Sequence, residues 1–262
     1  MPLILSCFRF FNIGFCALAL LLETRLLRGV PLSPGFLDGY IFGGTLFGYH
    51  CTHPDWRFRW LAWLFGLTAG ICLMSWELAG GNMLAAIAPI FFWLAYYGFR
   101  RPGNTGLRAW LLAKPFTIAL VWTWVTVFLP VSIKFWGNTQ LMFLERYAFI
   151  FTLAFSYDVS DLGYDRRAGF STLASKMTLK SNFSLIFIGL GLSALCVGLS
   201  FAKGYYDPFS VIPLFISLIF SAWWIFFLLH QPAWQAWHKV LIDGLMPLQC
   251  ALVLLLRFVI MK

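Results

Sequence analysis

Apolar residues along the chain gather in long runs that polar residues separate at short connections. Most runs approach the length of about 20 residues that an α-helix needs to cross about 30 Å of hydrocarbon. They lack the alternation of an outer-membrane strand, which excludes a barrel. The pattern predicts an all-α polytopic membrane bundle of about nine transmembrane helices, with residues 1–262 as a single transmembrane domain. The nine runs are Leu3 to Leu22, Phe36 to Tyr49, Trp60 to Ser75, Met83 to Phe99, Ala109 to Ile133, Leu141 to Tyr157, Phe183 to Ala202, Phe209 to Leu229 and Val240 to Met261.

The second and third runs are short for a bilayer. We expect them to extend into their flanking residues or to lie where the membrane is thinned and protein surrounds them. The first run, from Met1 to Leu22, carries only Arg9 near its start and has no small-residue cleavage signature. It therefore predicts a first membrane helix and not a removed signal peptide.

Composition supports a membrane protein. Of 262 residues, 61% are hydrophobic and 11% are charged, whereas soluble domains have about 45–50% apolar and about 25% charged residues. The net charge is +9, but the basic residues are spread through short loops. This distribution favours membrane lipids over nucleic acid as the partner. The six cysteines lie mostly within apolar runs at no ligand spacing, so we interpret them as apolar fillers.

The distribution of basic residues predicts the orientation. With the N-terminus inside, twelve Lys and Arg residues fall on the inner side and seven on the outer side, Arg146 among the seven. Inner loops carry the excess of positive charge. We therefore expect an integral multi-pass protein of a bacterial inner membrane with a cytoplasmic N-terminus. The connections after the second, fourth and sixth runs then share the cytoplasmic face.

Three of the ten carboxylates lie within eight residues at the end of the sixth run, at Asp158, Asp161 and Asp165. If the helix continues, Asp161 lies about 60° and Asp165 about 20° from Asp158, so all three project from one stripe. Like charges on one stripe need a positive partner, and Mg²⁺ is typically held by one or two carboxylates plus substrate phosphates. Arg166 and Arg167 follow directly, which indicates a diphosphate bridged by metal and clamped by guanidinium.

The alternative for this segment is a solvated loop end in which Asp158 and Asp161 pair with the two arginines. The cluster, however, directly follows an apolar span. Ionisable residues there are expensive and usually line a cavity. This position favours a functional site.

The pattern Asp158-x-x-Asp161-x-x-x-Asp165-x-x-x-Gly169-x-x-Thr172-Leu173 resembles the second aspartate-rich motif of the UbiA-type intramembrane prenyltransferases. The resemblance implies nine membrane helices, with the two motifs after helices two and six on the cytoplasmic face. It implies that aspartates hold Mg²⁺, which binds the diphosphate of a polyprenyl donor whose tail lies in an apolar tunnel. On this basis Asp158, Asp161 and Asp165 are metal ligands and Asp161 and Asp165 are catalytic. Tyr157, Arg166 and Arg167 are substrate-binding candidates.

Lys114, at the start of the fifth run, resembles a lysine of the same family that lies near the diphosphate. The alternative is a lysine that only extends its ammonium group to the headgroups. We include Lys114 among the substrate-binding candidates.

The first motif of the family carries an Asn followed by two or more Asp residues. The matching segment here, from Gly48 to Trp56, keeps one carboxylate, Asp55, and places His50 near the expected Asn. We expect His50, His53 and Asp55 to bind substrate, with hydrogen bonds to a lipid headgroup or to backbone as alternatives. A transition-metal site at the two histidines is weakly supported, because Pro54 intervenes and no further ligand is near.

Two functions from different classes remain open. The first is a membrane prenyltransferase that moves a polyprenyl group from its diphosphate to a lipid-soluble acceptor with Mg²⁺ assistance. The second is a divergent, non-catalytic member that binds a prenyl lipid or a partner protein. A phosphatidyl-group transferase is disfavoured because its longer acidic spacing is absent from the sequence. A transporter is disfavoured because the acids lie at one face of the bilayer and not at its midplane. The acceptor and the prenyl chain length stay open.

Overall fold

The computed structural model describes residues 3–51, 55–97, 100–101, 104–105, 113–131, 136–163, 172–231 and 237–260. Each of the nine predicted apolar runs contains helix. The long elements are α1 (Leu3–Arg28), α2 (Phe36–His50), α3 (Trp56–Leu78), α4 (Met83–Tyr97), α5 (Ala113–Thr123) with the π-helix η2 (Trp124–Phe128), α6 (Trp136–Ser160), α9 (Leu179–Ala202), α10 (Pro208–Leu229) and α12 (Leu245–Ile260). The short elements are α8 (Leu173–Lys176), α11 (His238–Asp243) and an antiparallel pair of two-residue strands, β1 (Arg100–Arg101) and β2 (Asn104–Thr105).

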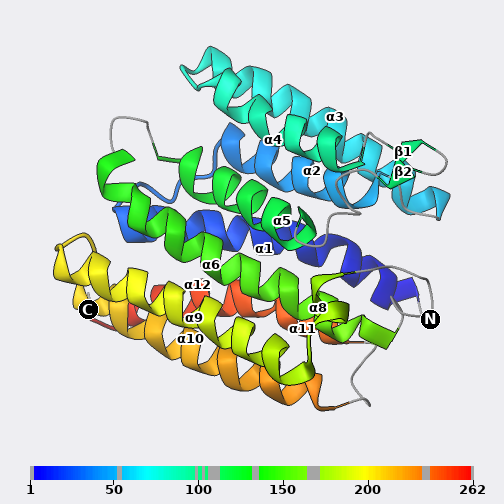
Figure 1. Cartoon of the computed structure of the whole chain (residues 1–262). Helices are drawn as coiled ribbons and strands as arrows, with labels where there is room; N and C mark the ends of the chain where they lie inside the picture. The colour runs from blue at the N-terminus through cyan, green and yellow to red at the C-terminus, as the bar shows by residue number, and fades with distance from the viewer. Residues whose placement is uncertain are drawn as a thin grey trace.

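The helices form an elongated bundle in which α2, α3 and α4 lie along one side and α9 and α10 along the other, with α1, α5, α6 and α12 between them (Figure 1). The closest packing joins α2 to α3, α6 to α9 and α5 to α6. Glycine permits one of these approaches, because a Cβ at Gly43 of α2 would lie 2.6 Å from the carbonyl oxygen of Phe65 in α3. Another glycine, Gly189 of α9, leaves room for the Thr152 side chain of α6, as close helix packing in membranes requires.

Five helical segments of the described chain are long and apolar enough to cross a membrane: Phe10–Arg28, Trp56–Leu78, Leu179–Ala202, Pro208–Leu229 and His238–Phe258. Two shorter apolar segments, Met83–Leu94 and Lys114–Phe128, accompany them. The third predicted run extends into its flanks to become the 23-residue α3, whereas α2 stays at 15 residues. The prediction of an all-helical, multi-pass membrane fold is confirmed.

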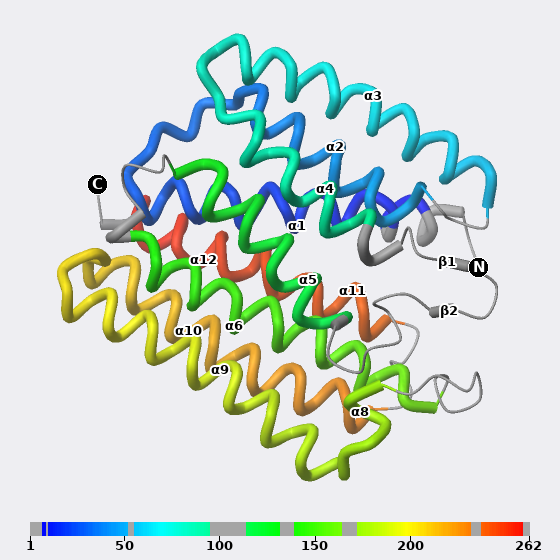
Figure 2. The backbone as a smooth tube through the Cα atoms, turned by 45° about the horizontal axis from the view of Figure 1, so that its top comes forward, coloured from blue at the N-terminus to red at the C-terminus, as the bar shows by residue number. Residues whose placement is uncertain are grey.

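The two ends of the bundle differ in what they gather. At one end, which we call the motif end, α2, α4 and α6 finish, α5 begins, and α8 and α11 lie (Figure 2). The C-terminus and the α3–α4 and α9–α10 turns lie at the opposite end. The helices that precede the second, fourth and sixth connections therefore end together, in agreement with the sequence pattern.

One predicted loop residue lies elsewhere. Arg146 is not in an outer loop but inside α6, with no exposed surface. Its guanidinium is therefore no orientation signal, and without it the loop charge is twelve on the inner side against six on the outer side, a larger bias than the sequence indicated. The cytoplasmic position of the N-terminus stays a prediction.

Candidate functional site

Asp158 lies in the last turn of α6 and is 1% exposed. Its carboxylate forms an ion pair with the ammonium group of Lys114, at the start of α5. The Lys114 side chain keeps a quarter of its surface exposed. This pair joins α5 to α6 at the motif end and places one buried negative charge beside one solvent-reaching positive charge.

Asp161 follows just beyond the end of α6, where its N–H group donates a 2.9 Å hydrogen bond to the carbonyl oxygen of Tyr157. Its carboxylate lies 2.8 Å from the ammonium group of Lys239 on α11. More than half of the Lys239 side chain is exposed. An ion pair that water reaches in this way contributes little to stability. An anionic ligand can therefore replace Asp161 at Lys239, or a cation can replace Lys239 at Asp161, with little loss of folding free energy.

The positive charge that the acidic stripe requires thus comes, within the described chain, from two lysines on different elements. Lys114 approaches from α5 and Lys239 from α11, and they contact different aspartates at the end of α6. The sequence pattern favoured arginines and a metal ion for this role. Asp165, Arg166 and Arg167 lie outside the described residues.

Tyr157 connects the motif to a carboxylate that sequence reasoning did not select. Its phenol donates a hydrogen bond to Oδ1 of Asp243, the last residue of α11, and also lies 3.3 Å from the carbonyl oxygen of Lys239. The sequence signal that could have identified Asp243 is its position near the start of an apolar run, because carboxylates at membrane depth are rarely without a role.

A proline positions Asp243. Pro247 lacks the N–H group that would bond the carbonyl oxygen of Asp243 four residues earlier, next to Gly244, the helical residue that joins α11 to α12. The thiol of Cys16 on α1 instead donates to that carbonyl oxygen at 3.4 Å. This bond joins α11 to α1, while the carboxylate of Asp243 contacts Tyr157 of α6.

The residues of the first motif have structural partners. Nε2 of His50 lies 3.2 Å from the carbonyl oxygen of Phe10, and the imidazole stacks on the Phe10 ring at 4.3 Å between centroids. Asp55 caps α3, because its Oδ1 accepts a 3.0 Å hydrogen bond from the N–H group of Arg57. His53 lies outside the described residues. Of the alternatives for His50, the structure shows a backbone contact.

The described donors suit Mg²⁺ only together with a ligand that brings its own oxygens. No group of three acid, His or Cys side chains in the described ranges is gathered closely enough to hold a metal ion. Asp161 has a quarter of its side chain exposed and precedes Asp165 by four residues in the sequence. In proteins, Mg²⁺ is usually held by one or two carboxylates together with substrate phosphates.

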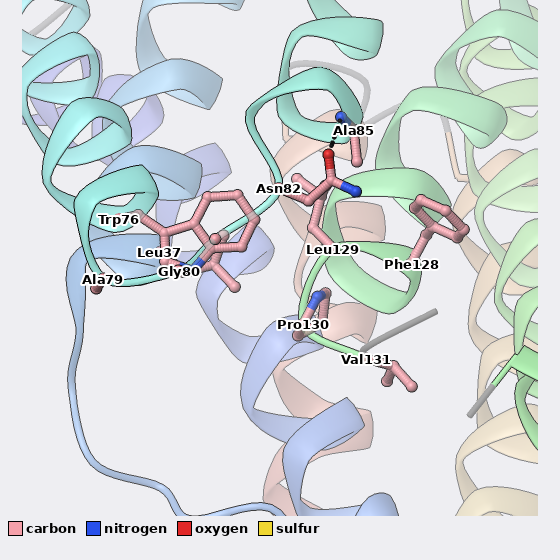
Figure 3. Close-up of a pocket in the computed structure, with 11 residues that line it drawn as sticks. Leu37, Trp76, Ala79, Gly80, Asn82, Ala85, Phe128, Leu129, Pro130 and Val131 are labelled. Atoms are coloured by element: carbon pink, nitrogen blue, oxygen red, sulfur yellow. Dashed lines mark hydrogen bonds between the residues drawn. The ribbon is translucent and has the colours of Figure 1, made fainter. Parts of the chain in front are cut away.

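A cavity of about 310 Å³ lies away from this site, at the opposite end of the bundle (Figure 3). It is lined by the α3–α4 turn and the residues that follow η2, and its polar side chain, Asn82, accepts a 3.1 Å hydrogen bond from the N–H group of Ala85. Fourteen residues of helix, or about 21 Å, separate Lys114 from Phe128 at the cavity. The described residues that line this hollow include no titratable side chain, and it is not part of the carboxylate cluster.

The fold and the ion-paired carboxylates define a polytopic helical membrane protein with a charged site at one end. Neither the family models nor the curated protein sequences contain a match to this chain. A solved structure described as digeranylgeranylglyceryl phosphate synthase in membranes matches over 94% of each chain, with a TM-score of 0.63 and 12% sequence identity. At this level of sequence identity the likeness shows a shared fold.

Proposed function

We propose that the protein is a membrane prenyltransferase that moves a polyprenyl group from its diphosphate to a lipid-soluble acceptor, with Mg²⁺ assistance. The observation that carries the proposal is the fold shared along 94% of the chain with a membrane digeranylgeranylglyceryl phosphate synthase. The aspartates at the end of α6, with their lysine partners, are the described charged groups that suit a diphosphate.

The diphosphate head would bind at the motif end. Lysine ammonium groups are common phosphate ligands, and Lys114 and Lys239 both contact aspartates at the α6 terminus. The buried carboxylate of Asp158 holds the Lys114 ammonium group at this position, so Asp158 is a positioning residue. Asp161 and Asp165 would hold Mg²⁺ with the phosphate oxygens. When bound, Mg²⁺ neutralises the charge that develops on the leaving diphosphate.

The prenyl tail would lie along α5 and α6. Aromatic rings descend from the Lys114–Asp158 pair along this boundary: the Phe116 ring lies 4.8 Å from that of Phe151 and 6.3 Å from that of Tyr147. Phe116 is 41% exposed, so one face of the row is accessible from the membrane. An apolar chain buries surface there, and aromatic faces beside the reacting carbon stabilise an allylic cation.

Tyr157 and Asp243 would form the acceptor side of the site. The phenol and carboxylate are hydrogen-bonded to each other and stand next to the Asp161–Lys239 pair through α11. An acceptor loses a proton when it is alkylated, and a positioned carboxylate is a suitable base for that proton. In this arrangement Tyr157 orients the Asp243 carboxylate.

The test uses the full chain purified into lipid nanodiscs with geranylgeranyl diphosphate, Mg²⁺ and a panel of lipid-soluble acceptors. We expect release of diphosphate that EDTA abolishes and excess Mg²⁺ restores. Asp161→Ala and Asp165→Ala should each reduce release at least a hundredfold. Glu77→Gln, at the exposed end of α3, is the matched control and should keep full activity. Metal-independent release, or full release in both alanine variants, would contradict the proposal.

A second candidate is a protein that binds a prenyl lipid without turnover. It is favoured by the first motif, because Asp55 caps a helix and His50 contacts backbone, so half of a two-metal site is engaged elsewhere. Such a protein would bind the diphosphate in the same nanodiscs but release no product with any acceptor. Asp161→Ala would then weaken binding alone.

A further inference from the structure

A second polar cluster lies deep inside the bundle, away from the site already described. It consists of Glu23 on α1, Glu145 and Arg146 on α6 and Gln249 on α12, all with no exposed surface. Twelve residues of α6, or about 18 Å of helix, separate Arg146 from Asp158 at the motif end. The proposed reaction uses none of these four side chains.

Arg146 and Glu23 form the ionic part of the cluster. Nη2 of Arg146 donates a 2.6 Å hydrogen bond to Oε1 of Glu23, and Nη1 donates a 3.0 Å hydrogen bond to the carbonyl oxygen of Leu20. A contact this short between a guanidinium and a carboxyl group is a charge-assisted bond. Glu23 is therefore the carboxylate that balances Arg146.

Within the described chain, the groups that donate hydrogen bonds to the Glu145 carboxyl group are neutral. Its Oε1 accepts hydrogen bonds of 3.4 Å from Oγ of Ser193 and from Nε2 of Gln249. The same Nε2 lies 3.4 Å from Oε1 of Glu23. The amide of Gln249 therefore bridges the two carboxyl groups.

The charges in this cluster do not balance if both acids are ionised. Two carboxylates would face one guanidinium, and an uncompensated charge inside a bilayer costs several kcal/mol. The cluster also contains three fully buried oxygens that have no hydrogen-bond partner among the residues that the structure describes: Oε2 of Glu23, Oε2 of Glu145 and Oε1 of Gln249. The other titratable groups that face it are neutral at pH 7 by type: Cys196 on α9, Tyr206 before α10 and Cys250 on α12.

We propose that this cluster is a proton-binding site in the membrane interior, in which Glu145 holds one proton at neutral pH while Glu23 stays ionised against Arg146. The proton removes the excess negative charge and converts one unpartnered acceptor oxygen into a donor. The unpartnered amide oxygen of Gln249 supplies an acceptor in the same cluster. The ligand is thus a single proton and the network as a whole is neutral.

Infrared spectroscopy of the full chain in nanodiscs tests the proton directly. At pH 7 the wild-type spectrum should contain a carbonyl stretch of a protonated carboxylic acid that Glu145→Gln removes. Glu77→Gln, at the exposed opposite end, is the matched control and should leave that band unchanged. Loss of a carboxylate band in Glu145→Gln, without loss of a carboxylic-acid band, would show that Glu145 is ionised and would overturn the proposal.

Thermal unfolding provides a second readout. Either single variant, Glu145→Gln or Glu23→Gln, leaves one acid and one base, so each should unfold within a few degrees of wild type at pH 7. The double variant leaves a lone buried guanidinium and should lose far more stability than the two single changes together. A double variant as stable as either single variant would contradict the charge count.

Sodium dependence tests the alternative that a metal cation, and not a proton, balances the charge of Glu145. If a metal cation balanced Glu145, the wild-type unfolding temperature would rise with sodium chloride relative to choline chloride at equal ionic strength, and Glu145→Gln would abolish this response. That result would overturn the proposal. Equal unfolding temperatures in the two salts support a proton.

Discussion

Lys239 lies 2.8 Å from Asp161, although 78 residues separate them in the chain. The pair brings the last connection of the bundle to the end of α6. His238, next to Lys239, is 5% exposed, and its Nε2 lies 3.2 Å from the carbonyl oxygen of Gln231. The connection before α12 is thus part of the candidate site.

Lys239→Met should separate binding from stability. The Lys239 side chain is mostly exposed, so the unfolding free energy should change by less than about 1 kcal/mol. If the ammonium group contacts the diphosphate, the KM for the prenyl diphosphate should rise about tenfold, the value of one charge-assisted contact. Steady-state diphosphate release measures KM, with Lys203→Met at the opposite end as the control. An unchanged KM would remove Lys239 from the site.

Lys114→Met should be costly to the fold. It removes the ion pair with the Asp158 carboxylate, which is 1% exposed, and a hydrogen bond to a charged group contributes about 1.5–3 kcal/mol. The partial exposure of Lys114 places the expected loss at the lower end of that range. Adding Asp158→Asn should restore stability without restoring activity. Denaturant unfolding and diphosphate release together measure this cycle, and recovery of activity in the double variant would show that Lys114 does not bind substrate.

Tyr157→Phe should reduce turnover more than substrate binding. The change removes the phenol that hydrogen-bonds to the Asp243 carboxylate and leaves the donor-side lysines in place. We expect kcat to fall about tenfold or more, since positioned acid–base groups contribute about 10²–10⁴-fold, with KM for the prenyl diphosphate nearly unchanged. Tyr205→Phe, in the α9–α10 turn at the opposite end of the bundle, is the control. A purely structural role would instead lower stability and leave the kcat of the folded fraction intact.

Asp55 offers a test between its two interpretations. As the N-cap of α3 it stabilises the helix, so Asp55→Ala should cost about 1 kcal/mol of unfolding free energy. Asn caps helices as well as Asp does, so Asp55→Asn should unfold like wild type. If that stable variant also keeps its Mg²⁺ dependence and its KM, Asp55 is only a cap. A loss of activity in Asp55→Asn would support the substrate-binding prediction.

The helical architecture could be predicted because hydropathy and length decide it. Run boundaries such as Phe36, Met83 and Leu229 coincide with helix boundaries, since an apolar segment in lipid must satisfy its own backbone. The grouping of α2, α4 and α6 ends follows from counting crossings alone.

The contacts within the site could not be predicted, because they depend on how helices pack. Nothing local to Asp158 or Asp161 indicates that one meets α5 and the other α11. Arg146 could not be distinguished from a loop arginine because its partner, Glu23, lies 123 residues earlier on another helix.

The hydrogen bond that Pro247 cannot make has a mechanical consequence. Lys239 and Asp243 stand on α11, which continues through Gly244 into α12 as one segment, His238–Phe258, that is long enough to cross a membrane. Within it, the carbonyl oxygen of Asp243 faces a residue without an N–H group four positions on, and helices bend most readily at such a proline. A ligand that draws Lys239 away from Asp161 can therefore tilt α11 about this point while α12 keeps its depth in the bilayer, so the mouth of the site adjusts to a charged head without disturbing the walls that would surround an apolar tail.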